Sequence, residues 1–374
     1  MTDAFHIRSV QAFCYRYPLT TPVVTSFGTM RDRPAVFIRV EDSDGVVGWG
    51  EVWCNFPAVG AEHRTRLIND MLAPMLAQRS VTHPSEVFEH LSTQMSVMAL
   101  QSGEPGPFAQ AIAGIDIALW DVFAQRARSP LWRLLGGTSG RMRVYASGIN
   151  PTGSVAMAEA ALGRGHRAFK LKIGFDAERD VANLTELRRL IGSDPIAVYG
   201  NQAWTLEQAM RLTPALEQFD LAWLEEPLRA DLPWPEWQTL KQGTAIPLAG
   251  GENIAGRDAF STALAQDVFS VVQPDVAKWG GITGCIAVAR DVIAAGRMYC
   301  PHYLGGGIGL LASAHLLAAA GGDGMLEVDS NDNPLRDQFC GAVASIEDGW
   351  IELPEASGLG IAPDIAAIER YRTL

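Results

Sequence analysis

The sequence predicts an α/β protein in which a (β/α)₈ barrel follows a separate α+β domain. From about residue 143 onward, short apolar strands alternate with helix-like stretches through eight repeats, the number that closes a parallel barrel. The first part of the chain instead shows strand-like segments followed by helices. A length of 374 residues also exceeds what one compact domain usually holds. We place the α+β domain at residues 1–140 and the barrel at residues 141–344.

The N-terminal region begins with strand-like segments and continues with helices. β-formers fill "HIRSVQAFCYRY", "PAVFIRVED" and "GVVGWGEVW", and the turn sequence "EDSDG" predicts a hairpin between the last two. The Gly/Pro/Thr-containing segment "TTPVVTSFGTMRDRP" predicts a long loop between the first two strands. Helical patterns follow over residues 61–78, 84–99 and 108–128, and the last is apolar on most faces, which indicates a buried helix.

The second region contains strand-like segments that are apolar throughout, as expected for strands buried on both faces. Helix-like stretches lie between them, for example over residues 176–191, 205–218, 256–266 and 281–296. The strand segments are "VYASGI", "AFKLKIG", "IAVYGN", "LAWLEEP", "IPLAGGEN", "SVVQPDVA", "MYCPHYL" and "GMLEVDS".

Charge and cysteine content exclude several classes of function. The formal net charge is −12, the pI is near 5.1 and no Lys/Arg-rich run occurs, so we expect neither nucleic acid nor membrane as a partner. No uninterrupted run of about 18 apolar residues predicts a membrane span. The five cysteines are scattered without a C-x-x-C motif, which is typical of reduced thiols and predicts a cytoplasmic protein.

Charged and titratable residues occupy the ends of the barrel strands. From Lys172 onward, successive candidates are 23 to 27 residues apart, about one βα unit each. Because the carboxyl ends of all barrel strands lie on one face, we expect these side chains to share one pocket. Taken singly, each could be a capping or solvated residue, but the regular spacing favours a common site. The candidates are Lys170, Lys172, Tyr199, Glu225, Glu252, Asp275, His302 and Glu327.

Two glutamates and two lysines suggest a metal ion with an adjacent base. Glu225 and Glu252 end neighbouring strands and offer the hard oxygen ligands that Mg²⁺ prefers. Lys170 and Lys172 share one face of a strand and point into the same site. Crowding beside a divalent ion lowers the pKa of a lysine, which could then serve as a general base. The alternative is that both lysines form salt bridges with these glutamates.

Asp275 and His302 end consecutive strands, where the carboxylate can orient the imidazole for proton transfer. A buried, hydrogen-bonded histidine is the alternative. With Glu327 as an acid opposite, the set predicts removal of the α-proton of a carboxylate substrate, with Mg²⁺ and a protonated acid holding the enediolate. Two bases on opposite faces would permit racemisation or epimerisation, and a β-hydroxyl leaving group would give dehydration.

A glycine-rich segment follows the seventh strand and offers a competing interpretation. Residues 307–312, "GIGLLA", fit the G-x-G-x-x-A form of the dinucleotide-binding fingerprint. The segment lies in the seventh of eight units, however, and NAD binding leaves the other strand-end charges unexplained. We therefore expect these backbone amides, at a helix N-terminus, to bind an anionic group of the substrate.

The chain resembles the enolase superfamily, specifically the mandelate racemase/muconate lactonizing enzyme group, over essentially its full length. The resemblance implies that the N-terminal region, completed by the C-terminal tail (about 345–374), forms a capping domain over the barrel. Loops near 18–34 and 51–60 would select the substrate. The motifs that carry the resemblance are "KLK" (170–172), "GNQAW" (200–204), "WLEEP" (223–227), "GGEN" (250–253), "QPDVAKWGGITG" (273–284), "PHYLGGG" (301–307) and "LEVD" (326–329).

The resemblance also implies roles for individual residues. Lys172 would be one base, Lys170 a contact to the substrate carboxylate, His302 with Asp275 the other base or acid, and Glu327 the enediolate stabiliser. Possession of both Lys-x-Lys and the His–Asp pair places the chain nearer mandelate racemase and the acid-sugar dehydratases than the lactonizing enzymes. A homo-oligomer is expected by the same resemblance.

Tyr199 departs from the family pattern, which has the first of three metal-binding carboxylates, an aspartate, at this position. A neutral phenol is a weak substitute, so Mg²⁺ affinity should fall. Three interpretations compete. Tyr199 could bind the substrate while Glu225, Glu252 and waters hold a weaker ion. It could fill the metal position and leave a degenerate, metal-poor enzyme or binding protein. Another carboxylate, for instance Glu226, could be recruited.

The remaining candidates are contacts to a small carboxylate substrate. Trp53 could cover an apolar or sugar face, and Arg31, with Arg33 beside it, could meet a second carboxylate. Asn201 and Lys278 belong to the motifs at the strand ends and complete the expected substrate-binding set.

Overall fold

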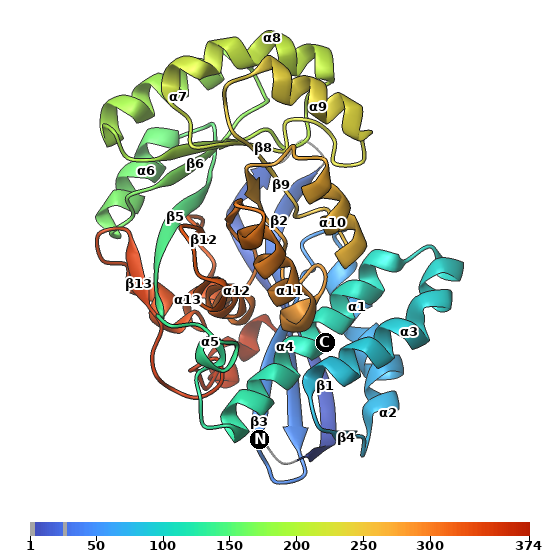
Figure 1. The fold of residues 1–374 in the computed structure, drawn as a ribbon. Helices are drawn as coiled ribbons and strands as arrows, with labels where there is room; N and C mark the ends of the chain where they lie inside the picture. Colours follow the sequence, from blue (N-terminus) through green and yellow to red (C-terminus); the bar gives the residue numbers. More distant parts are fainter. Residues whose placement is uncertain (1–3, 25–27) are drawn as a thin grey trace.

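The computed structural model describes residues 4–24 and 28–374, which form two parts (Figure 1). The N-terminal part is a four-stranded antiparallel sheet in the order β3-β2-β1-β4. Its predicted hairpin turn joins β2 to β3. The strands are β1 (Phe5–Val24), β2 (Thr29–Asp42), β3 (Val47–Val52) and β4 (Ser80–Val81).

The segment expected to be a long loop between the first two strands is mostly strand. β1 continues to Val24 and β2 begins at Thr29, and Val23 pairs with Met30 across a register shift that follows Pro18. The loop prediction was wrong because threonine and valine in this segment favour extended backbone, so the antiparallel pairing continues. The loop proposed over 18–34 is therefore largely an arm of the β1–β2 hairpin, and its residues 25–27 lie outside the described residues.

The predicted helices of the N-terminal part are confirmed. The first is continuous from α1 (Gly60–Arg66) through the π-helical η1 (Leu67–Leu72) to α2 (Ala73–Leu76), and α3 (Pro84–Ser102) and α4 (Pro105–Arg126) follow. By length and composition α4 could cross a membrane, but 89% of its apolar window is buried inside the molecule. It packs closely on β3: a Cβ atom at Gly50 would lie 2.0 Å from the carbonyl oxygen of Gly114.

The second part is the predicted parallel barrel. Its strands follow the order β11-β10-β9-β8-β7-β6-β5-β12, and β13 (Trp350–Glu352) pairs antiparallel with β5. The barrel strands are β5 (Arg141–Ile149), β6 (Phe169–Lys172), β7 (Ile196–Tyr199), β8 (Leu224–Glu225), β9 (Leu248–Gly250), β10 (Val271–Val272), β11 (Met298–Tyr299) and β12 (Met325–Asp329).

Helices follow the barrel strands and cover the outside of the sheet (Figure 1). A second core cluster takes residues from in or beside the barrel strands, and within it the rings of Tyr145 and Trp223 are 5.3 Å apart. This packed layer forms a floor beneath the strand ends. The helices are α6 (Ser154–Gly163), α7 (Ala177–Ile191), α8 (Leu206–Leu216), α9 (Trp234–Gly243), α10 (Arg257–Ala265), α11 (Gly281–Ala294) and α12 (Gly307–Ala320), with the short α5 (Leu131–Leu134) and α13 (Pro334–Asp337).

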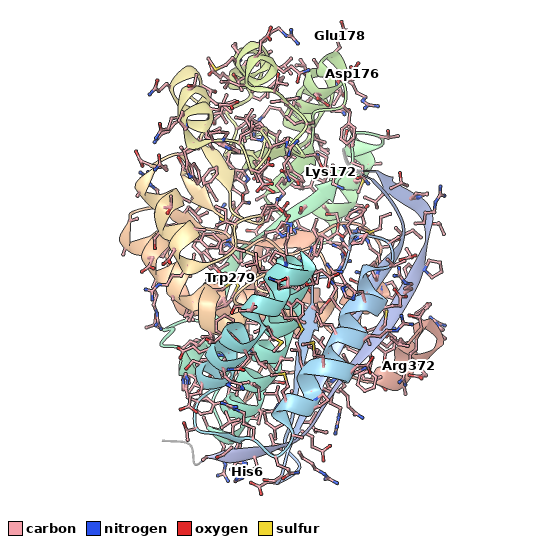
Figure 2. The ribbon with its side chains drawn as sticks, turned by 90° about the vertical axis from the view of Figure 1, so that its right-hand side faces the viewer. His6, Lys172, Asp176, Glu178, Trp279 and Arg372 are labelled. Atoms are coloured by element: carbon pink, nitrogen blue, oxygen red, sulfur yellow. The ribbon has the colours of Figure 1, made fainter. Side chains whose placement is uncertain are left out.

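The C-terminal tail returns to the N-terminal sheet. The backbone N–H of Thr373 donates to the carbonyl oxygen of Cys14 on β1 at 2.8 Å, and Tyr15 forms a β-bridge with Arg372. Figure 2 shows Arg372 beside the N-terminal strands. The last residues of the proposed tail therefore pack on the capping domain, whereas β13, which also lies within 345–374, pairs with the barrel strand β5.

The glycine-rich start of α12 is bound by the capping domain. The carboxylate of Glu51 on β3 accepts backbone N–H bonds from Gly306 at 2.5 Å and Gly309 at 2.8 Å. Burial raises the pKa of Glu51 to about 7, against the lowering effect of these amides. The expectation that these amides bind a substrate anion was therefore wrong, because a carboxylate 255 residues away in the same chain already occupies them.

Candidate active site

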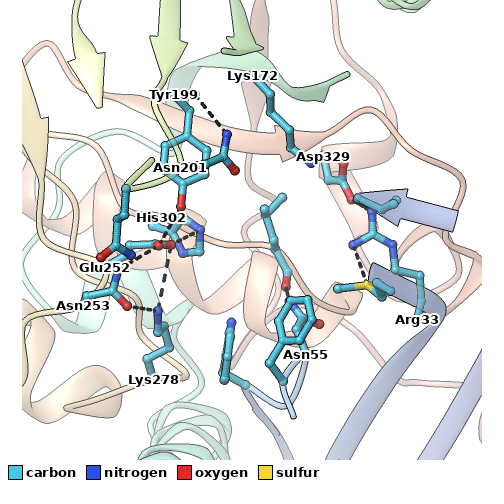
Figure 3. Close-up of a pocket in the computed structure, with 16 residues that line it drawn as sticks. Arg33, Asn55, Lys172, Tyr199, Asn201, Glu252, Asn253, Lys278, His302 and Asp329 are labelled. Carbon is cyan, nitrogen blue, oxygen red and sulfur yellow. Dashed lines mark hydrogen bonds and ion pairs between the residues drawn. The ribbon is translucent and has the colours of Figure 1, made fainter. Parts of the chain in front are cut away.

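A cavity of about 240 Å³ lies at the carboxyl ends of the barrel strands, beneath the capping domain (Figure 3). Strands and loops of both parts contribute to it. The capping domain supplies Val23, Met30, Arg33, Trp53, Asn55 and Phe56, and the barrel supplies Lys172, Tyr199, Asn201, Gln202, Glu252, Asn253, Lys278, His302, Leu304 and Asp329.

The cavity brings together part of the set predicted from the sequence. Seven predicted residues line it: Trp53, Lys172, Tyr199, Asn201, Glu252, Lys278 and His302. Four others are buried behind the cavity wall: Lys170, Glu225, Asp275 and Glu327. Arg31 is exposed on β2 and lies outside the lining set.

Lys170 is fully engaged with two carboxylates below the cavity. Its ammonium nitrogen, Nζ, lies 2.6 and 2.8 Å from the two oxygens of Glu225 and 2.7 Å from Glu327. Burial lowers the pKa of Lys170, but these two carboxylates outweigh that effect and raise it. For this residue the alternative of a salt bridge to the glutamates describes the structure, and Lys170 does not reach the cavity.

Glu327 is held as a carboxylate rather than presented to the cavity as an acid. It accepts hydrogen bonds from the Ser147 hydroxyl and, at 3.0 Å, from the backbone N–H of Tyr303. Burial raises its pKa, but Lys170 and His302 outweigh burial and lower it. This arrangement differs from the protonated acid expected at the position.

Lys172 differs from Lys170 because it reaches the cavity and, among the residues that the structure describes, forms no direct ion pair. Its Nζ donates to Asn150 Oδ1 at 3.3 Å. Burial, together with the nearby charges of Arg33 and Lys170, lowers its pKa to about 8, although Asp329 acts in the opposite direction. A substantial fraction of the amine is therefore neutral near pH 8, as a general base requires.

His302 lies between two carboxylates. Its Nδ1 is 2.8 Å from Asp275 and its Nε2 is 2.6 Å from Glu252. Burial lowers the pKa of His302, but the charges of Glu252 and Glu327 and the bond to Asp275 raise it well above its usual value. The imidazole is therefore protonated at neutral pH and suited to donate a proton.

Tyr199 ends β7 and contacts a carboxylate directly. Its hydroxyl donates to Glu252 Oε1 at 3.2 Å, and burial together with the charge of Glu252 raises its pKa well above 10. Asn253 bridges Glu252 and Glu226, with Nδ2 at 3.0 and 2.8 Å. Burial and the neighbouring Glu252 raise the pKa of Glu226 to about 8, so its carboxyl group is largely protonated at neutral pH.

Arg33 and Asp329 form the opposite wall. The sequence predicts a role for Arg33 only beside Arg31, and none for Asp329. Arg33 lies 2.7 Å from Asp329, and both are nearly fully buried. Asp329 follows Glu327 by two positions on β12, a spacing that signals a shared face. Nearer the histidine, the Lys278 Nζ donates to Asn253 Oδ1 at 2.9 Å and lies 4.9 Å from the centre of the Trp53 ring.

A barrel with acid–base residues at its strand ends, closed by a capping domain, defines the class of two-domain barrel enzymes that act on small molecules. Residues 7–136 match the family described as "Mandelate racemase / muconate lactonizing enzyme, N-terminal domain", and residues 154–367 match "Enolase C-terminal domain-like". The chain therefore belongs to the mandelate racemase/muconate lactonizing enzyme group of the enolase superfamily.

Similar solved structures and a similar named enzyme support this assignment. A mandelate racemase/muconate lactonizing enzyme from Bordetella bronchiseptica RB50 shares 53% identity with a TM-score of 0.94, covering 99% of this chain and 100% of the other. A racemase from Streptomyces coelicolor A3(2) with bound magnesium shares 28% identity with a TM-score of 0.86, covering 98% and 100%. The 3,6-anhydro-alpha-L-galactonate cycloisomerase of S. coelicolor is 31% identical over 97% of this chain and 99% of its own length.

Further relatives are named as acid-sugar dehydratases. Dehydratases, cycloisomerases and a racemase are among the similar proteins, and they support an isomerase or lyase activity for this chain.

The residues present do not fit the Mg²⁺ site that the family implies. Among the described residues, no group of three His, Cys, Asp or Glu side chains is arranged to hold a metal ion. The position of the first ligand is the phenol of Tyr199. Glu225 is bound by Lys170, by Gln273 Nε2 at 2.6 Å and by Trp223 Nε1 at 3.1 Å. Glu252 is bound by His302.

Proposed function

We propose that this protein removes the α-proton of a small carboxylate substrate, either as a dehydratase of acid sugars or hydroxy acids or as a racemase or epimerase. One observation carries the proposal: Lys172 and His302, an amine with a lowered pKa and a protonated imidazole, line the same cavity. They come from β6 and the loop after β11, which lie far apart in the strand order, and Figure 3 shows them reaching the cavity from different sides.

The proposed chemistry assigns one proton transfer to each side of the substrate. Lys172 Nζ takes the α-proton, and the electrons of the broken C–H bond form the enediolate of the carboxylate. In dehydration, those electrons then expel the β-hydroxyl, which takes a proton from His302 and leaves as water, giving an enol that becomes a 2-oxo acid. In racemisation, His302 returns a proton to the α-carbon from the other face. Asp275 keeps the imidazole oriented throughout.

The ammonium group of Lys278 is the donor best placed to receive the substrate carboxylate. It lines the cavity next to His302 and Glu252, and its only close carboxylate in the described residues, Glu252, is 4.0 Å away. Mg²⁺ has no part in these steps because the donors do not fit it. A cytoplasmic location is part of the proposal and is supported by five buried cysteines without disulfides. A homo-oligomer stays a prediction.

Deuterium exchange tests the proposal. The protein is incubated in D₂O with arabinonate, galactonate, galactarate and mandelate, acids that occur in the names of similar proteins, and α-deuteration is followed by NMR. We expect exchange with at least one acid, and a loss of about 10²- to 10⁴-fold in Lys172→Met. Lys241→Met, at a half-exposed lysine outside the cavity, is the matched control and should leave exchange unchanged.

Absence of exchange with every acid would refute the proposal. It would favour the second candidate, a metal-poor member of the superfamily that binds carboxylates without turning them over. The observation that favours that candidate concerns His302: both of its ring nitrogens contact carboxylates, so neither is free to exchange a proton with a substrate while these contacts last.

A further inference from the structure

The strand ends where the family carries metal-binding carboxylates are already occupied by internal partners. In this chain those positions are Tyr199 on β7, Glu225 on β8 and Glu252 after β9. Tyr199 and Glu225 are direct neighbours in the sheet register. The Tyr199 hydroxyl donates to Glu252 instead of offering a charged oxygen to a cation.

Both oxygens of Glu225 already accept hydrogen bonds inside the protein. One of its oxygens accepts from Lys170, and the other accepts from Lys170, Gln273 and Trp223. The residue is 1% exposed and lies outside the lining of the cavity. A divalent cation would have to displace the Lys170 ammonium from Glu225 and would then face it as a like charge in a buried setting.

Lys170 is held in place from several sides. Besides Glu225, its Nζ contacts Glu327 at 2.7 Å. The rings of Tyr145 and Tyr199 each lie with their centres 5.4 Å from the same nitrogen, within the range of a cation–π interaction. Tyr199 therefore has two contacts that an aspartate would not reproduce: its ring faces the ammonium and its hydroxyl reaches Glu252.

We propose that this site works without a divalent metal ion, with Lys170 as the fixed positive charge between Glu225 and Glu327 and Lys278 as the cation that receives the substrate carboxylate. The part that concerns Lys278 rests on the proposed function, whereas the part that concerns Lys170 and Tyr199 does not. Three of the four lysines in the whole chain, Lys170, Lys172 and Lys278, belong to this one site, and only Lys241 lies elsewhere.

Metal binding is tested with Mn²⁺, followed by its EPR signal, on the intact protein. We expect no saturable binding by the wild-type protein. Tyr199→Asp should bind Mn²⁺ at least about tenfold more tightly than the wild-type protein, because the aspartate supplies a charged ligand. Tyr199→Asn should not, because asparagine has the shape of aspartate but no charge. Saturable binding by the wild-type protein would overturn the proposal. No gain in the aspartate variant, or an equal gain in the asparagine variant, would overturn the role given to Tyr199.

Lysine NMR and exchange in the absence of metal separate this proposal from the proposed function. With ¹³Cε-lysine labelling, the four lysine signals should stay unchanged on addition of Mg²⁺, and a shift of the Lys170 signal would contradict the proposal. Deuterium exchange should proceed equally in EDTA and in Mg²⁺. Exchange that requires Mg²⁺ would overturn the metal-free site but leave Lys172 and His302 as the proposed acid–base pair. Absence of exchange under both conditions would refute the proposed function and the role given to Lys278, and would leave the roles given to Lys170 and Tyr199 to the Mn²⁺ experiment.

Discussion

The lowered pKa of Lys172 depends on Arg33, and the substitution Arg33→Met tests this dependence. Arg33 acts on Lys172 in two ways: its own charge repels the ammonium, and it neutralises Asp329, to which it binds at 2.7 Å. Without Arg33, Asp329 would keep the longer ion pair to Arg336, at 3.8 Å. Its carboxylate would then favour the charged form of Lys172 more strongly. The pKa of Lys172 should therefore rise from about 8 toward its ordinary value of 10.5.

The expected size follows from the geometry of the pair. A buried carboxylate that has lost its closest ion-pair partner shifts the pKa of a nearby lysine by about one unit, equivalent to about 1.4 kcal/mol. At pH 7, about a tenth of Lys172 is neutral when its pKa is 8, and about a hundredth when its pKa is 9. A reaction that uses the neutral amine would then slow about tenfold at pH 7 and recover at high pH.

The assay reads the amine directly and needs no substrate. Because the chain has four lysines, a ¹³Cε-lysine sample gives four signals, and Lys172→Met identifies the one to follow through a pH titration. Arg31→Met, at an exposed residue two positions earlier on β2, is the matched control and should leave the titration unchanged. Arg33→Met/Asp329→Asn removes both opposing charges and should return the pKa toward about 8. An unchanged or lowered pKa in Arg33→Met would refute the reasoning.

Three further predictions concern stability and are checked by chemical denaturation. The pKa of Glu51 is raised from 4.5 to about 7 on folding. Its contribution to the free energy of unfolding, at most about 3 kcal/mol, is therefore complete below pH 4.5 and lost as pH rises through 7. Glu51→Gln should remove this pH dependence of stability. Burial lowers the pKa of His315 to about 4, so the protein loses stability as pH falls from 6.5 toward 4, and His315→Gln should flatten this limb, with an unaltered limb contradicting the assignment. Gly50→Ala should destabilise the protein by about 1–3 kcal/mol or more because its Cβ meets the backbone of α4, whereas Gly163→Ala, in open space on α6, should be neutral or stabilising.

The location of the site could be predicted because the barrel repeats. Each βα unit returns the chain to the same face, so a spacing of 23 to 27 residues between strand-end residues is enough to gather Lys172, Tyr199, Glu252 and His302 around one cavity. The order of the strands follows from the same repetition.

The sequence did not predict how deep each strand-end side chain lies below the cavity. Lys170 and Lys172 share a face, but two residues along a strand correspond to about 6.6 Å, which separates a buried counter-ion from a residue at the cavity. The same holds on β2, where Arg33 lines the cavity and Arg31 is exposed. Periodicity gives the face of a strand and carries no information on how far along it the cavity begins.

Pairings between distant segments were also inaccessible from the sequence. The amides that begin α12 have the pattern of an anion site, and the anion is Glu51 from the capping domain. Which anion these amides bind depends on how the capping domain packs on the barrel, and no local sequence pattern predicts that packing.

The most direct test of Lys172 as the base that removes the α-proton is the pD dependence of α-proton exchange in the metal-free protein. We predict that the exchange rate rises with an apparent pKa near 8, set by the neutral amine of Lys172, and that Lys172→Met abolishes this rise. Exchange that persists undiminished in Lys172→Met would contradict the account.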